Sequence, residues 1–156
     1  MTTLAPTNVH ISQASVDDLA ALTPMFDGYR QFYGQPSDLY VAREFLLERL
    51  HNQESVIFMA RDQATQKALG FTQLYPSFSS ILAARIFIVN DLYVTPLARG
   101  HKVGARLLQA AIVHGRTHGA KRLSLSTGVL NKRAQALYEG QGWVANTRFQ
   151  AYDLAL

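Results

Sequence analysis

A short segment in the second half of the chain combines cations and glycines in a pattern suited to binding an anion. It reads Arg99-Gly100-His101-Lys102-Val103-Gly104 and lies between a strand-like pattern and a helical apolar pattern. A turn that enters a helix presents unpaired backbone N–H groups and the positive end of the helix dipole. Arg99 and Lys102 add full positive charges. The segment predicts a phosphate site, although a glycine-containing turn of any α/β protein can have this composition.

Two common nucleotide-binding patterns are missing from the segment and from the first strand. The sequence holds no G-x-x-x-x-G-K-[ST], and no G-x-G-x-x-G follows the first strand. These absences argue against a P-loop NTPase and against a Rossmann dinucleotide-binding protein.

Composition limits the class of protein. The 156 residues are 48% apolar and 17% charged, which predicts one globular domain over residues 1–156. Without cysteine, the chain lacks a thiolate nucleophile, an iron–sulfur cluster and disulfides. We expect no metal site, because no His/Asp/Glu group has ligand spacing. The longest apolar stretch is short and contains Arg85, and the N-terminus lacks a signal-peptide pattern, so we expect a cytoplasmic protein without membrane contact.

The positive charge is concentrated in one part of the chain. The net charge is +4, yet residues 95–138 carry 8 Lys and Arg and no acidic residue, whereas residues 1–94 carry 6 basic and 9 acidic residues. Such a block indicates an anionic partner, namely nucleic acid, a phosphorylated cofactor or a membrane, or else a solvated basic face.

Apolar periodicity predicts the elements that must position these groups. Helices are expected over residues 19–29 despite Pro24, from a cap at Ser37 or Asp38 to residue 50, over 100–118, and from Asn131 to 140. Strands are expected over residues 9–11, 55–60, 68–75, 85–94, 123–127, 143–144 and 149–154, with a loop over 76–80. This order predicts an α/β (α+β) single domain whose sheet combines hairpins with a parallel crossover.

A second motif stands about 30 residues after the first and follows a strand. Asn131, Ala134, Tyr138, Gly142 and Trp143 fit N-x-x-[AS]-x-x-x-Y-x-x-x-G-[FW]. The first segment fits [QR]-x-x-G-x-[GA] at Arg99 and Gly104, with Lys102 where glycine is usual. With the element order, these motifs make the chain resemble the GNAT superfamily of acetyl-CoA-dependent N-acetyltransferases. Residues 29–35 and 73–80 resemble a bacterial subgroup of amino-acid, polyamine and histone-type acetyltransferases.

The resemblance implies a fold and a set of cofactor-binding residues. The GNAT fold is a mixed, mostly antiparallel sheet of about six to seven strands, flanked by about four helices. Its fourth strand carries a bulge and splays from the fifth, and acetyl-CoA lies in the gap. The implied cofactor-binding residues are Leu92, Tyr93, Val94, Arg99, Gly100, His101, Lys102, Val103, Gly104, Ala105, Asn131, Ala134 and Tyr138. Lys132 or Arg133 is expected near the adenosine 3′-phosphate. The resemblance therefore assigns the positive charge of the basic block mainly to the side of the protein that binds the cofactor.

The resemblance also assigns candidate catalytic groups. A phenol with a pKa of about 10 can donate to a thiolate whose conjugate acid has a pKa of about 8.5, so Tyr138 is the candidate acid. Asp91 is the candidate base, directly or through water. The alternative for Tyr138 is a core tyrosine without a catalytic role. The alternative for Asp91 is a structural hydrogen-bonding residue at the bulge. His101, His114 and His118 are expected near the exposed side of their helix and not as bases.

The acceptor pocket of the family corresponds to residues 27–35 and 75–78. The candidate substrate-binding residues are Tyr29, Tyr33, Tyr75 and Asn90. Aromatic faces together with a carboxylate in this region suit a cationic amine.

The implied activity is transfer of the acetyl group from acetyl-CoA to a primary amine of a small molecule (amino acid or polyamine-like) or peptide. With no cysteine for an acetyl-enzyme, direct attack in a ternary complex is expected. The alternative is a non-catalytic acyl-CoA-binding regulatory module. Binding to nucleic acid is not expected, because no recognition motif accompanies the basic block. A homodimer is expected.

Overall fold

A five-stranded sheet lies at the centre of the larger of two compact units. The computed structural model describes residues 8–156, and these divide into residues 8–126 and 127–156. In the larger unit the strand order is β1-β2-β3-β4-β5. The strands are β1 (Val9–Gln13), β2 (Val56–Asp62), β3 (Ala68–Ser79), β4 (Ala84–Val94) and β5 (Arg122–Ser124). The first four pair antiparallel and β5 joins β4 parallel, so the predicted mixed sheet is confirmed.

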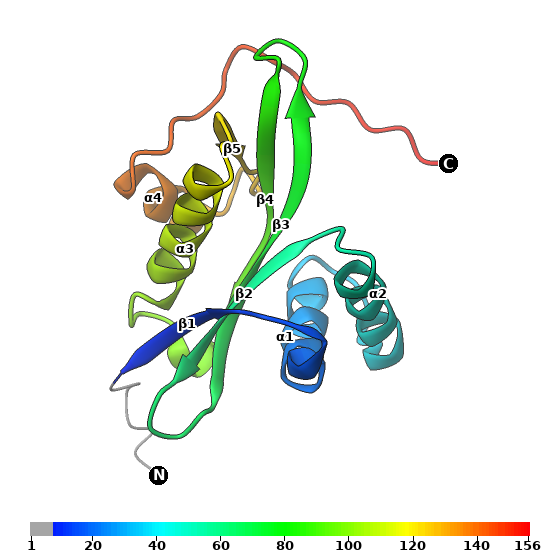
Figure 1. The fold of residues 1–156 in the computed structure, drawn as a ribbon, viewed down its shortest axis with the longest axis vertical. Helices are drawn as coiled ribbons and strands as arrows, with labels where there is room; N and C mark the ends of the chain where they lie inside the picture. The colour runs from blue at the N-terminus through cyan, green and yellow to red at the C-terminus, as the bar shows by residue number, and fades with distance from the viewer. Residues whose placement is uncertain (1–7) are drawn as a thin grey trace. The chain divides into compact units, whose positions relative to one another are not determined.

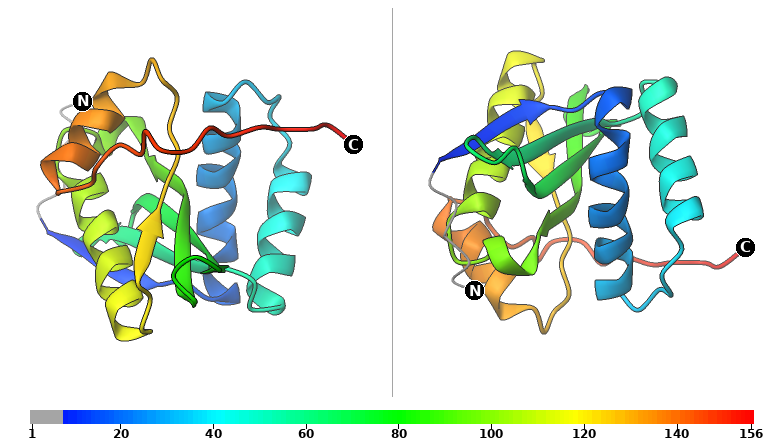
Figure 2. Two further views of the ribbon diagram at one scale, coloured as in Figure 1. Left: turned by 90° about the horizontal axis from the view of Figure 1, so that it is seen from above. Right: turned by 90° about the horizontal axis from the view of Figure 1, so that it is seen from below.

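Helices cover both faces of this sheet (Figures 1 and 2). Helices α1 (Leu19–Phe32) and α2 (Leu39–His51) pack on one face, where Phe71 is at the centre of the buried side chains. Helix α3 (Val103–Thr117) packs on the other face, against Ala60 and Leu69 among others. Two 3₁₀ turns, Val16–Asp18 and Pro96–Ala98, precede α1 and α3. Helices α1 and α2 therefore begin where the sequence predicts, whereas α3 begins at Val103 and not at residue 100.

Local capping chemistry fixes the helix starts. Ser15 and Asp18 form the predicted reciprocal capping box at the turn before α1. Of the two candidate caps for α2 it is Asp38 that acts, because its Oδ1 accepts from the Val41 N–H at 2.9 Å. Pro24 stands inside α1, as the spacing of the apolar residues requires.

Strand β3 extends further than predicted. The loop expected over residues 76–80 is wrong, because β3 continues through Pro76, which pairs with Phe87. The pairing of β2 with β3 stops at Val56 and Leu74, so beyond that point β3 pairs, within residues 8–156, with β4 alone. A proline is tolerated on a strand edge because it has no N–H to leave unpaired there.

A bulge interrupts the β3–β4 ladder in the middle of both strands. Gln73 pairs with Asp91 and the next residue, Leu74, pairs with Val89, so Asn90 is extra. The fourth strand therefore carries a bulge, as predicted. Close to it, a Cβ on Gly70 would lie 2.5 Å from the carbonyl oxygen of Tyr93, so only glycine lets the two backbones approach.

The parallel ladder between β4 and β5 is short. It joins Ile86 to Arg122, Phe87 to Leu123 and Ile88 to Ser124, and then stops. Among the described residues, the part of β4 that follows Ile88 has no strand partner on this edge. The ladder ends in the region where the fourth and fifth strands are predicted to separate.

The smaller unit contains one helix, α4 (Lys132–Gly140). The two final strands predicted over residues 143–144 and 149–154 are absent from the described residues, so the sheet has five strands and not six to seven. Alternating apolar residues predict a strand only where a neighbouring backbone can pair with it. The apolar side chains of this segment are exposed instead, namely Val144, Phe149, Tyr152 and Leu154.

None of the helices within residues 8–156 has the length and apolar character needed to cross a lipid bilayer.

A buried carboxylate joins the end of α1 to the start of α2. Asp27 is 3% exposed and accepts hydrogen bonds from the Asp38 N–H (2.8 Å), the Ser37 hydroxyl (2.7 Å) and Gln31 Nε2 (2.8 Å). Arg30 lies 3.8 Å from it. Burial alone would raise the pKa of Asp27, but these hydrogen bonds and the Arg30 charge outweigh burial and lower that pKa. Ionised Asp27 therefore stabilises the connection.

Replacing this carboxylate is expected to destabilise the protein. Asp27→Asn should lower the free energy of unfolding by about 1–3 kcal/mol at pH 7, because the buried charge is lost and the donors that face the new amide nitrogen lose their acceptor. The folded-state pKa of Asp27 is lowered, so its contribution is present above the unfolded-state pKa and is lost as the pH falls through the folded-state pKa. Urea unfolding at pH 7 and at acidic pH measures both effects.

The matched control is Glu44→Gln, which removes an exposed carboxylate paired with Arg43. It should cost less than about 1 kcal/mol. Equal effects of the two substitutions, or a difference that does not shrink in acid, would contradict the structural role of Asp27.

Candidate active site

The carboxyl group of Asp91 is buried at the bulge of β4. The residue is 1% exposed. Gln73 Nε2 donates to its Oδ2 at 2.5 Å, and Asn90 Nδ2 donates to its Oδ1 at 2.8 Å. Its backbone carbonyl accepts from the Thr72 hydroxyl at 2.8 Å. The bulge therefore places a carboxyl group, with two amide donors, inside the sheet face that α1 covers.

Burial sets the proton affinity of this group. Desolvation raises the pKa of Asp91, and the hydrogen bonds from Asn90, Gln73 and Tyr29 only partly oppose the rise. A carboxyl group with a raised pKa is a better proton acceptor near neutral pH than an exposed one. Asp91 thus has the electrostatics of a base, as well as the hydrogen bonds of a structural residue.

Three of the four predicted substrate-binding residues gather around Asp91. The Tyr29 hydroxyl donates to the carbonyl of Asn90 at 3.1 Å. Burial, and then the charge of Asp91, raise the pKa of both Tyr29 and Tyr75. Both phenols therefore stay neutral at the pH values at which enzymes usually work.

The fourth, Tyr33, belongs to the aromatic cluster at the end of α1. Its ring centroid lies 5.1 Å from that of Tyr29, and it is half exposed. Tyr29 in turn packs edge-on against Phe71 of β3, at 6.3 Å. The cluster joins the predicted acceptor region to the core beneath it.

The expected acceptor carboxylate is not free. Asp27 is the carboxylate of residues 27–35, and its oxygens are taken by Ser37, Asp38 and Gln31. It holds a connection between helices and does not face an acceptor amine. The carboxyl group whose charge acts on both Tyr29 and Tyr75 is that of Asp91.

Gln73 is the residue that the sequence analysis missed. It is fully buried in the middle of β3 and touches the Asp91 carboxyl group. The only signal in the sequence is an amide within an otherwise apolar strand pattern. Its partner could not be read from sequence, because the pairing of Gln73 with Asp91 depends on the bulge.

The predicted anion loop joins β4 to α3. Arg99 Nε donates to the carbonyl of Val94 at 3.0 Å, and its guanidinium carbon lies 5.9 Å from the Tyr93 ring centroid. Gly100 and Lys102 both have positive φ, at 83° and 60°. No side chain caps the start of α3, so its first turn and the nearby cations are suited to an anion. The other predicted loop residues lie in the turn or in this first turn of α3, namely His101, Val103, Gly104 and Ala105.

The second motif forms the start of α4 in the smaller unit. Asn131 Oδ1 accepts from the Ala134 N–H at 3.2 Å, which makes it the predicted cap. The Tyr138 ring lies 6.2 Å from that of Trp143, and the Tyr138 carbonyl accepts from the Trp143 N–H at 3.1 Å. The motif spacing therefore encodes a capped helix and a closed C-terminal turn.

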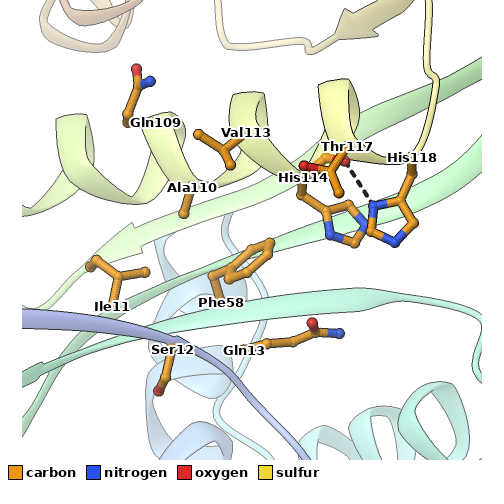
Figure 3. Close-up of a pocket in the computed structure, with 10 residues that line it drawn as sticks. All are labelled: Ile11, Ser12, Gln13, Phe58, Gln109, Ala110, Val113, His114, Thr117 and His118. Atoms are coloured by element: carbon orange, nitrogen blue, oxygen red, sulfur yellow. Dashed lines mark hydrogen bonds between the residues drawn. The ribbon is translucent and has the colours of Figure 1, made fainter.

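A hollow of about 380 Å³ opens on the opposite face of the sheet, between β1 and α3 (Figure 3). Of its two histidines, His118 is exposed as predicted, whereas His114 is partly buried against Phe58 and Phe87. Burial, and then the charge of His118, lower the pKa of His114. These residues lie on the α3 side, away from Asp91. Within residues 8–156, no group of three or more metal-ligating side chains exists.

Comparison with known proteins agrees with this geometry. The profile of the Acetyltransferase (GNAT) family matches residues 21–143, which include the bulge, the loop and α4. The chain belongs to the GNAT family. It is therefore an acetyltransferase, of the type that transfers to nitrogen. The GNAT family generally uses acetyl-CoA.

Relatives of this GNAT protein cover nearly its whole length. It is 47% identical over 146 residues to the uncharacterized N-acetyltransferase YhfO of Bacillus subtilis (strain 168), with 94% of this chain and 97% of that protein covered. A probable acetyltransferase of Haemophilus influenzae (strain Rd) is 30% identical over 139 residues, with 89% and 92% covered. The crystal structure of a probable acetyltransferase superposes with a TM-score of 0.89 at 42% identity, covering 94% of this chain and 97% of that one.

The departure from the GNAT loop pattern has a conformational cost. Lys102 occupies a left-handed backbone conformation, φ 60° and ψ 15°, at the position where the pattern has glycine. An L-residue in this conformation is strained by about 1–2 kcal/mol relative to glycine. The exposed lysine thus brings a cation to the loop at the expense of stability.

Restoring glycine at this position should stabilise the protein. Lys102→Gly is expected to raise the free energy of unfolding by up to about 1 kcal/mol, because relief of strain exceeds the added entropy of the unfolded chain. Arg106→Gly, at an exposed position inside α3, should lower it by about 1 kcal/mol. Chemical denaturation of both variants measures the contrast. Destabilisation by both substitutions would show that the left-handed strain of Lys102 is not significant.

Proposed function

We propose that the chain transfers the acetyl group of acetyl-CoA to a primary amine, carried by an amino acid or polyamine-like small molecule or by a peptide. The amine attacks the thioester directly in a ternary complex. The observation that carries this proposal is the buried carboxyl group of Asp91, beside Tyr29 and Tyr75, with its pKa raised by burial. The two units act as one N-acetyltransferase domain over residues 1–156, which is supported by a family match that runs across both.

Asp91 serves the first chemical need of the reaction, a neutral amine. An alkylammonium has a pKa of about 10.4, so deprotonating it at pH 7 costs about 4–5 kcal/mol at 1.36 kcal/mol per pKa unit. A positioned carboxylate or a water held by it takes this proton. Asn90, which is exposed and donates to Asp91, lies between the carboxyl group and solvent.

The loop and the edge of β4 suit acetyl-CoA. Arg99, Lys102 and the uncapped start of α3 supply positive charge for a pyrophosphate. Beyond Ile88 the edge of β4 has no strand partner among residues 8–126, so backbone from Leu92 to Val94 is available to a pantetheine arm. The Val94 carbonyl is an exception, because it already accepts from Arg99.

The second half of the reaction needs an acid for the leaving group. The new bond joins the amine nitrogen to the acetyl carbon, and the carbon–sulfur bond breaks to release a thiolate. We assign donation of a proton to this thiolate to Tyr138. Its position at the end of a capped α4, against Trp143, is compatible with a fixed hydroxyl.

The acceptor is proposed to be cationic. Tyr29 and Tyr33 offer aromatic faces beside a carboxyl group, which favours an ammonium. The acidic excess of residues 1–94 acts in the same direction. These features support the proposal that the protein belongs with the amino-acid, polyamine and histone-type acetyltransferases.

We further propose that the protein works in the cytoplasm as a homodimer and binds neither nucleic acid nor membranes. The basic residues of the 99–102 loop are used for the pyrophosphate, and Val144, Phe149 and Leu154 expose apolar side chains suited to a second copy. The molar mass in solution tests the dimer.

The activity is tested with purified protein, acetyl-CoA and a panel of amines that includes amino acids, diamines, polyamines and lysine peptides. Free thiol should appear with at least one cationic amine and require both substrates. Carboxylic acids and alcohols of similar size are the control acceptors. Acetyl-CoA binding without thiol release across the panel would favour the non-catalytic regulatory module instead.

Tyr138→Phe tests the acid. Loss of a general acid costs typically 10²–10⁴-fold in kcat, whereas the dissociation constant for acetyl-CoA should change little. Tyr152→Phe, at an exposed position of the same unit, is the matched control and should retain full activity. An unchanged kcat in Tyr138→Phe would remove Tyr138 from this role.

A further inference from the structure

One polar atom of the Gln73 side chain lacks a hydrogen-bond partner among the described residues. It is fully buried, and its Nε2 donates to Asp91 Oδ2 at 2.5 Å. Its Oε1 is also buried, yet nothing among the described residues donates to it. A buried acceptor without a partner destabilises a fold, so it calls for an explanation.

The orientation of the Gln73 amide depends on the charge of Asp91. A carboxylate only accepts hydrogen bonds, so it selects the N–H side of the amide and leaves Oε1 free. A protonated Asp91 can donate to Oε1, and then Nε2 loses its acceptor. The contact therefore favours ionised Asp91 only while Gln73 keeps its present orientation.

The position of the two residues makes this contact part of the site. Gln73 and Asp91 are directly paired across β3 and β4, at the bulge that also brings Asn90 to Asp91. Asn90 is exposed and Gln73 is not, so the carboxyl group is held from the solvent side and from the core side. A free acceptor beside a buried proton acceptor is suited to hold a water molecule.

We propose that Gln73 is a positioning residue for acetyl transfer: its N–H holds the Asp91 carboxylate, and its free Oε1 accepts a hydrogen bond from the water that relays the amine's proton. The ammonium gives its proton to this water, which gives a proton to Asp91, and Asp91 returns it to solvent after turnover. The relay rests on the proposed function, whereas the effect of Gln73 on Asp91 does not.

Among the titratable groups that interact with Asp91, Asp91 is the one whose protonation should change over the pH range of the test. Tyr29 of α1 and Tyr75 of β3 interact with it, and Tyr33, which follows α1, interacts with Tyr29. The pKa values of Tyr29 and Tyr75 are raised by burial, so both remain neutral through the range of the test. The charge of Arg49 of α2 acts on Tyr75 and opposes part of the rise in its pKa.

Two substitutions separate positioning from packing. Gln73→Met keeps a long unbranched side chain but removes the N–H donor and the free acceptor. Gln73→Glu keeps the shape and places two carboxyl groups side by side, which disfavours ionisation of both. The matched control is Gln109→Met. Gln109 is exposed and belongs to α3, the helix on the opposite face of the sheet.

The first measurement follows Asp91 by carbon-detected NMR titration of its carboxyl group, without substrates. Asp91 should titrate at higher pH in both Gln73 variants than in the wild type, and further in Gln73→Glu. The control should match the wild type. Unchanged titration of Asp91 in variants that remain folded would overturn the proposal, whether or not the wild type acetylates any amine.

The second measurement is the pH profile of kcat with an amine that the wild type acetylates. The acid limb should move to higher pH in both variants, with a loss of about 10–100-fold in kcat at pH 7 that recovers in part at alkaline pH. The dissociation constant for acetyl-CoA should stay the same. An equal loss of kcat at every pH, with an unmoved limb, would indicate a purely structural Gln73 and overturn the proposal.

Discussion

One extra residue in β4 determines where the proposed catalytic carboxyl group lies. Side chains of a strand alternate between the two faces of the sheet, so an inserted residue changes the face of every side chain beyond it. With Asn90 as the insertion, Asp91 pairs with Gln73 and faces the side covered by α1, where Tyr29 reaches the backbone of Asn90. The register shift thus brings a carboxyl group, two amides and a phenol to one place. Without it, Asp91 would point toward α3 and the site would not form.

Hydrogen bonds and apolar packing around Asp91 offset part of the free-energy cost of burying its carboxyl group. Burying a carboxyl group is unfavourable, and Gln73 and Asn90 each return one hydrogen bond to it. The apolar cluster of α1, α2 and the inner strands carries the stability of this face, with Phe71 fully buried beneath Tyr29. Asp27, two residues before Tyr29 in α1, is buried too, but its hydrogen bonds are complete enough to lower its pKa. The two aspartates differ in role because one has donors for its charge and the other has too few. An uncompensated cost thus remains at Asp91, the proposed base, and the left-handed conformation of Lys102 adds a second one in the loop before α3.

Prediction from the sequence succeeded where the signal was local and failed where it was not. The capping box at Ser15, the cap at Asp38 and the cap at Asn131 are all contacts within three residues, and all three were correct. The loop at residues 76–80 was wrong because Pro76 usually ends a strand, yet here the loss of β2 as a neighbour makes the position an edge. The strands over residues 143–154 were wrong because alternation does not supply a pairing partner. The role of Asp27 was missed because two of its donors, Ser37 and Asp38, lie 10 and 11 residues further along the chain, beyond the range of a local pattern.

The sequence by itself determined the family, the order of most elements and the two motifs, because each depends on residues at fixed short spacing. Arg99 to Gly104 form a turn into a helix, and Asn131 to Trp143 form a capped helix with a closed end, as their local patterns predict. Only the tertiary structure decided which carboxyl group is available for chemistry and which amide holds it. That decision lies in the pairing of Gln73 with Asp91, 18 residues apart in the chain, and in a bulge whose position no local pattern encodes. Strand register is set by the packing of both strands against α1 and α3, so it appears only when the whole sheet is assembled.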